Sequence, residues 1–95
     1  MDILKWLEKW YFSMCDGSWE HFYGVKIDTL DNPGWMVLID IIDTSLEEKV
    51  FETFNRYVNE NDWIHCQIRE GKFDGGGDPS KLMEILQIFK DWVEA

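Results

Sequence analysis

Apolar residues change their spacing twice along this chain, and this change constrains the fold more than any other feature of the sequence. Near the N-terminus they recur at positions 3, 7, 10 and 14, which predicts a helix over residues 2–14. From Tyr23 onward they alternate with polar residues, as they do in strands whose two faces differ. Between Leu82 and Val93 the helical spacing returns. The chain therefore reads as helix, strands, helix.

Turn signals divide the alternating part into short strands. We expect strands over residues 21–30, 35–42 and 63–69. Between the first two, Asp31-Asn32-Pro33-Gly34 predicts a type II turn with Gly34 at positive φ. Residues 72–74 continue the sheet, and Gly75-Gly76-Gly77 is expected to end it. Residues 44–60 are ambiguous and are predicted as a short helical turn followed by a strand.

The last helix is predicted to begin with Asp78 as its cap and Pro79 at its first position. Two terminal helices with one apolar face each need a common surface to cover. We therefore predict an α+β fold: an antiparallel sheet of four to five strands, with the N-terminal and C-terminal helices packed on one face. The 95 residues are expected to form a single domain, 1–95.

The second face of this sheet has a mixed character. The helix-covered face would carry Val25, Ile27, Val37, Ile39, Ile64, Cys66 and Ile68. The other face would carry Phe22, Lys26, Asp28, Met36, Leu38, Asp40, Trp63, His65 and Gln67. This set is too apolar for a face that meets only water and too charged for a core, which is typical of a partner-binding surface. Alternatively, residues 44–58 fold over it and bury it.

Acidic residues dominate the charge. The formal net charge is −10, and residues 16–62 hold eleven acids against three bases. Nucleic acids and anionic membranes would be repelled, because their binding relies on Lys and Arg. A basic protein partner would be steered toward such a field. The alternative is that the charge serves only solubility.

The segment Cys15-Asp16-Gly17-Ser18-Trp19-Glu20-His21 collects the most reactive side chains. It lacks the spacing of a metal site, so we predict no metal and no cofactor. Helix capping and a half-buried tryptophan account for it, or it forms a contact patch. The candidate partner-binding residues are Asp16, Trp19, Glu20, His21, Asp28, Asp40, Trp63 and His65.

Enzymatic activity is not expected. The run from Cys66 to Gly71 superficially resembles the cysteine loop of rhodanese-type sulfurtransferases. That chemistry needs an activated thiolate in a loop, whereas Cys66 alternates with Ile64 and Ile68 in a predicted strand. Both cysteines are expected to be free thiols. The chain has neither a signal-peptide core near its start nor an apolar run long enough to span a membrane, so a cytoplasmic location is predicted.

Taken together, these segments resemble a known family. The residues that carry the resemblance are Trp6, Trp10, Cys15–His21, Gly24, Leu30–Trp35 and Asn61–Ile64, with the C-terminal helix. The chain resembles the immunity protein 53 family of bacterial polymorphic toxin systems. This resemblance implies a small cytosolic protein, encoded beside a toxin, that binds and blocks the toxic domain. A general interaction or homodimerising module and a thiol-dependent enzyme are the alternatives.

Overall fold

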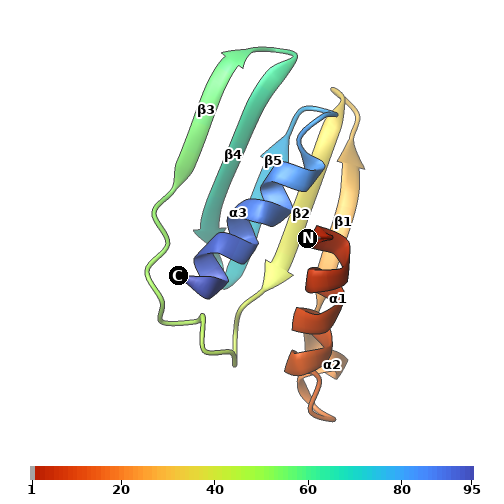
Figure 1. The fold of residues 1–95 in the computed structure, drawn as a ribbon, viewed down its shortest axis with the longest axis vertical. Coiled ribbons are helices and arrows are strands. Elements are labelled where there is room, and N and C mark those ends of the chain that lie inside the picture. The colour runs from red at the N-terminus through yellow and green to blue at the C-terminus, as the bar shows by residue number, and fades with distance from the viewer. Residues whose placement is uncertain (1) are drawn as a thin grey trace.

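A five-stranded antiparallel sheet forms the centre of the fold (Figure 1). The computed structural model describes residues 2–95. Its strands are β1 (Val25–Leu30), β2 (Gly34–Asp40), β3 (Phe54–Asn59), β4 (Asp62–Arg69) and β5 (Lys72–Gly77). Its helices are α1 (Ile3–Met14), α2 (Trp19–Phe22) and α3 (Leu82–Glu94). The strand order is β1-β2-β5-β4-β3, so β2 and β5 lie in the middle.

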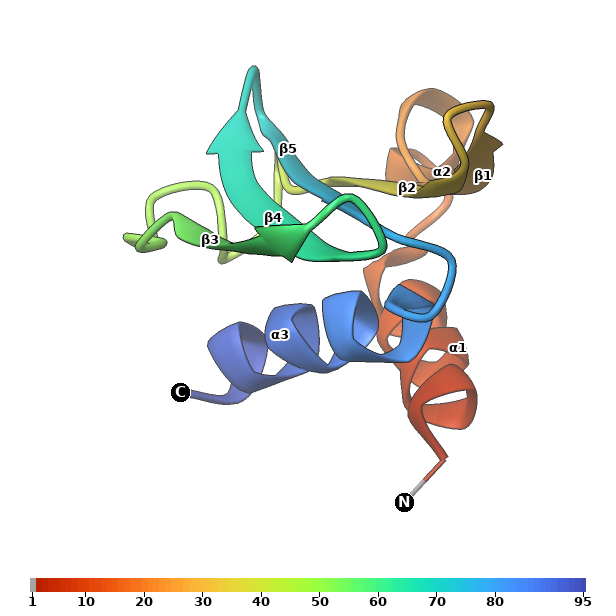
Figure 2. The same cartoon turned by 90° about the horizontal axis from the view of Figure 1, so that it is seen from above.

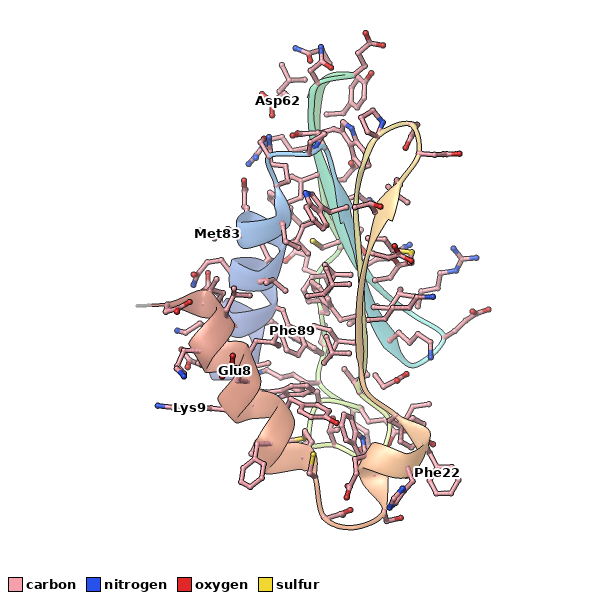
Figure 3. The ribbon with its side chains drawn as sticks, turned by 90° about the vertical axis from the view of Figure 1, so that its right-hand side faces the viewer. Glu8, Lys9, Phe22, Asp62, Met83 and Phe89 are labelled. Carbon is pink, nitrogen blue, oxygen red and sulfur yellow. The ribbon has the colours of Figure 1, made fainter. Side chains whose placement is uncertain are left out.

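Both long helices pack on the same face of the sheet, which confirms the predicted α+β architecture. Figure 2 shows α1 and α3 side by side beneath the strands, with α2 on the other side. The core between the layers is aromatic. Phe89 points from α3 toward the sheet (Figure 3), and its ring centroid lies 5.0 Å from that of Trp10 and 5.1 Å from that of Phe73. This packing buries the apolar stripes of both helices.

The N-terminal helix follows the sequence prediction closely. Asp2 caps α1, since its Oδ1 accepts a hydrogen bond from the backbone N–H of Leu4 at 2.9 Å. Ile3, Leu7 and Trp10 form its buried stripe. The first strand was predicted too long, because Trp19–Phe22 forms the short helix α2 and β1 begins only at Val25.

The prediction that Gly75, Gly76 and Gly77 end the sheet is wrong. Gly75, Gly76 and Gly77 all belong to β5, which pairs with β2 and β4. Glycine is required at Gly75 and Gly77, because α3 and its preceding turn approach the strand closely there. A β-carbon on Gly77 would lie 2.7 Å from Cβ of Lys81. The missing side chains therefore make room for the helix layer.

The turn before β2 also differs from its prediction. Gly34 does not have a positive φ and is the first residue of β2. It is buried where a β-carbon would collide with the carbonyl oxygen of Gly77. The demand for glycine thus comes from the neighbouring strand and not from the turn.

Asp78 has a different role from the predicted helix cap, because α3 begins only at Leu82. The buried Asp78 carboxylate accepts hydrogen bonds from the backbone N–H groups of Trp63 (2.9 Å) and Ser80 (2.8 Å) and from Nζ of Lys81 (2.7 Å). The bonds from Lys81 and Ser80 hold the pKa of Asp78 well below its usual range. Asp78 therefore ties the start of β4 to the turn before α3.

The connection between β2 and β3 runs along the helix side of the molecule. Phe51 packs against Phe73 and Trp92, with ring centroids 5.7 and 5.3 Å away. Lys49 Nζ donates to the backbone carbonyl of Trp92 at 2.7 Å, near the end of α3. Turns followed by β3 agree with the prediction for residues 44–60. The alternative that residues 44–58 cover the second sheet face is wrong.

Candidate functional site

The sheet face turned away from α1 and α3 lies open, and we call it the open face. The strand registers place on it Lys26, Asp28, Met36, Leu38, Asp40, Asn55, Tyr57, Trp63, His65, Gln67, Lys72 and Asp74. All the sheet residues predicted for this face are present. Phe22 was also predicted for this face, but it belongs to α2, which precedes β1, and not to the sheet. The face therefore combines aromatic, aliphatic and charged groups on a rigid support.

Trp63 is the largest side chain of the open face. A β-carbon on Gly76 would lie 3.7 Å from Cζ3 of Trp63, so the indole ring lies beside the bare backbone of the central strand β5. His65 is paired with Gly76 in the register, and so is Met36 from the other side. The Trp63 ring thus lies over Gly76 at the middle of the sheet, with His65 and Met36 as the register neighbours of this glycine.

The backbone N–H of Trp63 is hydrogen-bonded within the protein, whereas its indole N–H is not. Its N–H donates to Asp78, which fixes the start of β4. Four other tryptophans, Trp6, Trp19, Trp35 and Trp92, donate their indole N–H to acceptors in the protein. Within residues 2–95 the indole N–H groups of Trp10 and Trp63 have no such acceptor, but Trp10 lies in the core, whereas Trp63 lies on the open face and its N–H is not a buried unsatisfied group. It can therefore donate to a partner.

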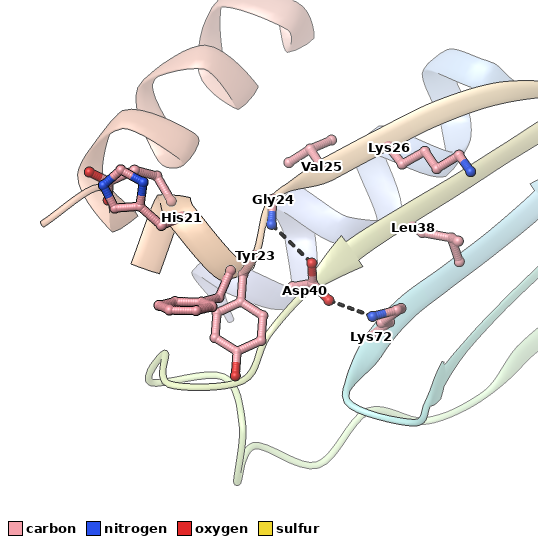
Figure 4. Close-up of a pocket in the computed structure, with 10 residues that line it drawn as sticks. His21, Tyr23, Gly24, Val25, Lys26, Leu38, Asp40 and Lys72 are labelled. Atoms are coloured by element: carbon pink, nitrogen blue, oxygen red, sulfur yellow. Dashed lines mark hydrogen bonds and ion pairs between the residues drawn. The ribbon is translucent and has the colours of Figure 1, made fainter. Parts of the chain in front are cut away.

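A groove of about 420 Å³ lies where α2 meets the end of the open face (Figure 4). Asp40 is one of the residues that line it. One carboxylate oxygen accepts from the backbone N–H of Gly24 at 2.9 Å, and the other accepts from Nζ of Lys72 at 2.7 Å. The hydrogen bond to Asp40 raises the pKa of Lys72. The charge of Asp40 is thus neutralised locally, and this residue positions the groove instead of offering a free carboxylate.

Asp16 and Glu20 shape the loop before α2. Oδ1 of Asp16 accepts from the backbone N–H groups of Ser18 and Trp19, both at 2.9 Å. Glu20 in turn accepts from the N–H groups of Asp16 and Gly17 at 3.0 and 2.9 Å. The Trp19 and Ser18 N–H groups lower the pKa of Asp16, and the N–H groups of Glu20 itself, Asp16 and Gly17 lower that of Glu20. This reciprocal arrangement resembles a capping box.

Trp19 lies in the core, where only 4% of its surface is exposed. Its ring packs against Trp10 at a centroid distance of 6.2 Å, and its indole N–H donates to the carbonyl of Ile42 at 2.9 Å. Buried in this way, Trp19 cannot touch a partner directly. The helix-capping interpretation of this segment therefore accounts for Asp16, Trp19 and Glu20.

The structure brings the predicted residues together at two places. His21 and the 77% exposed Phe22 project from α2 beside the groove. Asp28, Trp63 and His65 lie on the open face.

Sequence reasoning missed Tyr57 and Asp74 as members of this surface. Tyr57 is 69% exposed and pairs with Trp63 in the register of β3 and β4. Asp74 lies between Leu38 and Gln67 on β5. The alternation of residues 54–59 could have indicated Tyr57, but the uncertain assignment of that segment concealed it.

The thiol of Cys66 is not an activated nucleophile. Both Cys15 and Cys66 are free thiols. Cys66 is buried on the helix-covered face, where burial, with the charges of Glu84 and Asp74, raises the pKa of its thiol to about 12. A sulfurtransferase needs the opposite shift. Nor do three His, Cys, Asp or Glu side chains converge as metal ligands anywhere in residues 2–95.

Fold and surface define the class as a small acidic α+β domain with two helices on one sheet face and the other face uncovered. No helix in residues 2–95 has the length and apolar character needed to cross a membrane. The chain belongs to the immunity protein 53 family, since the model of that family matches residues 4–94. No curated protein and no solved structure shows significant similarity to it. Family membership supports an immunity function.

Proposed function

We propose that this protein binds the toxic domain of a cognate bacterial toxin in the cytoplasm and thereby blocks it. The toxin is a basic, nuclease-like protein in this proposal, and the open face together with α2 forms the binding surface. Family membership supports the immunity role. The aromatic and acidic character of the surface supports this mode of binding.

The observation that carries the proposal is the position of Trp63. An aromatic side chain on a rigid, uncovered sheet, with an indole N–H that lacks an acceptor within residues 2–95, has the properties of a binding hot spot. Tyr57 lies next to it across β3 and β4, and His65 follows it on the same face of β4. These residues would form the centre of the interface.

Charge supplies attraction over longer distances. Asp28 and Asp74 lie on the open face and form no ion pair with any residue of the described chain, although Oδ1 of Asp28 accepts a hydrogen bond from the N–H of Thr29. With the net charge of −10, they favour a basic surface such as the phosphate-binding cleft of a nuclease. Asp16, Trp19, Glu20 and Asp40 act indirectly in this proposal, because their polar atoms are used to position α2 and the groove.

The test is co-expression with the toxin encoded beside the gene, read out as growth rescue and co-purification. Trp63→Ala is expected to raise the dissociation constant at least about thirtyfold, the effect of losing a hot spot of about 2 kcal/mol. Phe12→Ala is the matched control, since Phe12 is an exposed aromatic residue on α1. Circular dichroism and thermal unfolding would show that both variants fold.

Two results would contradict the proposal. A well-folded wild-type protein that neither rescues growth nor co-purifies with the neighbouring toxin would remove the immunity role for that toxin. Rescue that survives Trp63→Ala but is lost with Phe12→Ala would retain immunity and move the interface to the outer face of α1.

A further inference from the structure

The two edge strands of the sheet differ in how well they are protected. On β3, the register with β4 shifts between Tyr57 and Asn59, and Arg56 is held by Glu84 of α3 at 3.0 Å. Bulges of this kind discourage pairing with another strand. On β1, the register with β2 runs without a shift from Val25 to Leu30. β1 therefore offers a regular edge.

One hydrogen bond shows which backbone N–H and C=O groups of β1 face β2 and which face outward. The N–H of Asp40 donates to the carbonyl of Gly24 at 3.0 Å, so Gly24 faces β2. Backbone groups alternate in direction along an antiparallel strand. Lys26 and Asp28 consequently direct their N–H and C=O groups toward β2. Val25, Ile27 and Thr29 direct theirs away from the sheet, which creates a row of donors and acceptors along the edge. In the single chain one of these donors, the N–H of Thr29, donates to Oδ1 of Asp28 at 2.8 Å, and it would have to exchange this bond for one to the second copy.

This edge is complementary to itself. When a second copy of β1 is placed antiparallel with Ile27 opposite Ile27, the outward backbone groups of both strands face each other. Lys26 of each copy then lies opposite Asp28 of the other, on the open face. Opposite charges in such cross-strand pairs are stabilising. The arrangement contains this favourable pair twice.

The same charges exclude the neighbouring registers. Moving the second copy by two residues in one direction places Lys26 opposite Lys26, and in the other direction it places Asp28 opposite Asp28. Like charges directly opposite each other are destabilising. The order of charges on β1 thus selects one register, the one centred on Ile27.

Apolar surface borders this edge on the helix side. Ile27 is 38% exposed, which is unusual for a side chain on the covered face of a sheet. Next to it, a groove of about 440 Å³ runs between α1 and β1, lined by Leu4, Leu7, Glu8, Tyr11, Gly24 and Val25. In the centred register, Thr29 of the second copy lies opposite Val25 at this groove. Pairing would cover the exposed Ile27 of both copies.

We propose that two copies of this protein pair through their β1 edges, antiparallel about Ile27, to form a continuous ten-stranded sheet. The occupant of the edge is a second copy because the charge order of β1 fits itself in one register. This proposal does not depend on the immunity function. In the pair, the two open faces lie on the same side of the extended sheet.

Sedimentation equilibrium over a range of protein concentrations tests the pairing, at about 0.15 M salt to screen the repulsion between two acidic proteins. The wild type is expected to show a monomer–dimer equilibrium. Lys26→Asp and Asp28→Lys should each raise the dimer dissociation constant about tenfold or more, since two attractive pairs become repulsive. The double variant K26D/D28K restores both pairs in swapped form and should return to within about threefold of the wild type.

The single variants also separate pairing from net charge. Lys26→Asp makes the protein more acidic and Asp28→Lys makes it less acidic, yet pairing predicts that both weaken the dimer. The control is Asn55→Lys on the other edge strand, which should leave the dissociation constant unchanged. A monomeric wild type at all concentrations would overturn the proposal. So would single variants whose effects follow net charge, or a double variant as weak as either single one.

An Ile27→Lys variant tests whether the β1 edge binds the toxin and not a second copy of this chain. If the wild type is monomeric but Ile27→Lys abolishes binding to the toxin, the β1 edge serves the toxin and the self-pairing proposal is wrong. If the wild type dimerises and Ile27→Lys makes it monomeric with toxin binding intact, the edge serves the second copy as proposed.

Discussion

A β-carbon placed on Gly75 would lie 2.5 Å from Cγ2 of Ile85, so α3 packs directly on the backbone of β5 at this point. Both residues are buried at the centre of the molecule. The contact explains why glycine stands at this position of a central strand. It also sets the distance between the helix layer and the sheet that carries the open face.

Substitution of Gly75 should therefore be costly. We expect Gly75→Ala to lower the free energy of unfolding by about 1–3 kcal/mol, because the methyl group overpacks the interface with α3. Gly76→Ala is the matched control on the same strand, since its β-carbon would meet nothing closer than 3.7 Å. It should change stability by less than about 1 kcal/mol. Urea unfolding of both variants makes the comparison, and equal losses would disprove the role of the α3 contact.

Charge at the open face should affect the rate of association with the toxin. Asp74→Lys is expected to slow association and flatten its dependence on salt, as electrostatic steering predicts. Glu48→Lys makes the same change of charge in the exposed connection before β3 and should have a smaller effect. Stopped-flow binding at several salt concentrations measures both. If the two variants slow association equally, the overall field matters and the location of Asp74 does not.

Thiol reactivity should distinguish the two cysteines. Cys66 is buried and the pKa of its thiol is raised to about 12, so almost no thiolate is present at pH 8. One thiol, that of Cys15, should react with a disulfide reagent in the native protein, and a second should react only in denaturant. Cys15→Ser should leave the native protein nearly unreactive. Rapid native labelling of Cys66 would reopen the thiol-enzyme alternative.

Stability should depend on pH through Asp78. The pKa of Asp78 is lower in the folded chain than in the unfolded chain, so its contribution is present above the usual carboxyl pKa and is lost as the pH falls through the folded-state pKa. Asp78→Asn removes the charge that binds Lys81. The difference in stability between wild type and variant should be largest above about pH 5 and shrink toward about pH 2.

Denaturant unfolding at several pH values tests this dependence. Asp31→Asn, in the exposed turn between β1 and β2, serves as the control and should show no comparable trend. A wild-type advantage over Asp78→Asn that stays constant from pH 6 to about pH 2 would contradict the assignment of the carboxylate charge.

The candidate surface was only partly visible in the sequence. Alternation along β4 correctly placed Trp63 and His65 on the face opposite Ile64 and Cys66, because the direction of a side chain in a strand depends only on the parity of its position. Trp19 shows the limit of that reasoning. Its polar neighbours suggested an exposed contact, but its burial depends on Trp10 and Ile42, which lie elsewhere in the chain.

By itself, the sequence determined the elements whose signal is local. The apolar spacing fixed α1 and the C-terminal helix, alternation fixed β2 and β4, and the acidic composition fixed the sign of the electric field. Only the tertiary structure decided that β5 lies in the middle of the sheet, that residues 41–53 run along the helix side, and that β1 is left as a regular edge. These features depend on contacts between distant residues. In the sequence alone, a glycine that ends a strand cannot be distinguished from a glycine against which a helix packs, because the contact with the helix forms only in the folded chain.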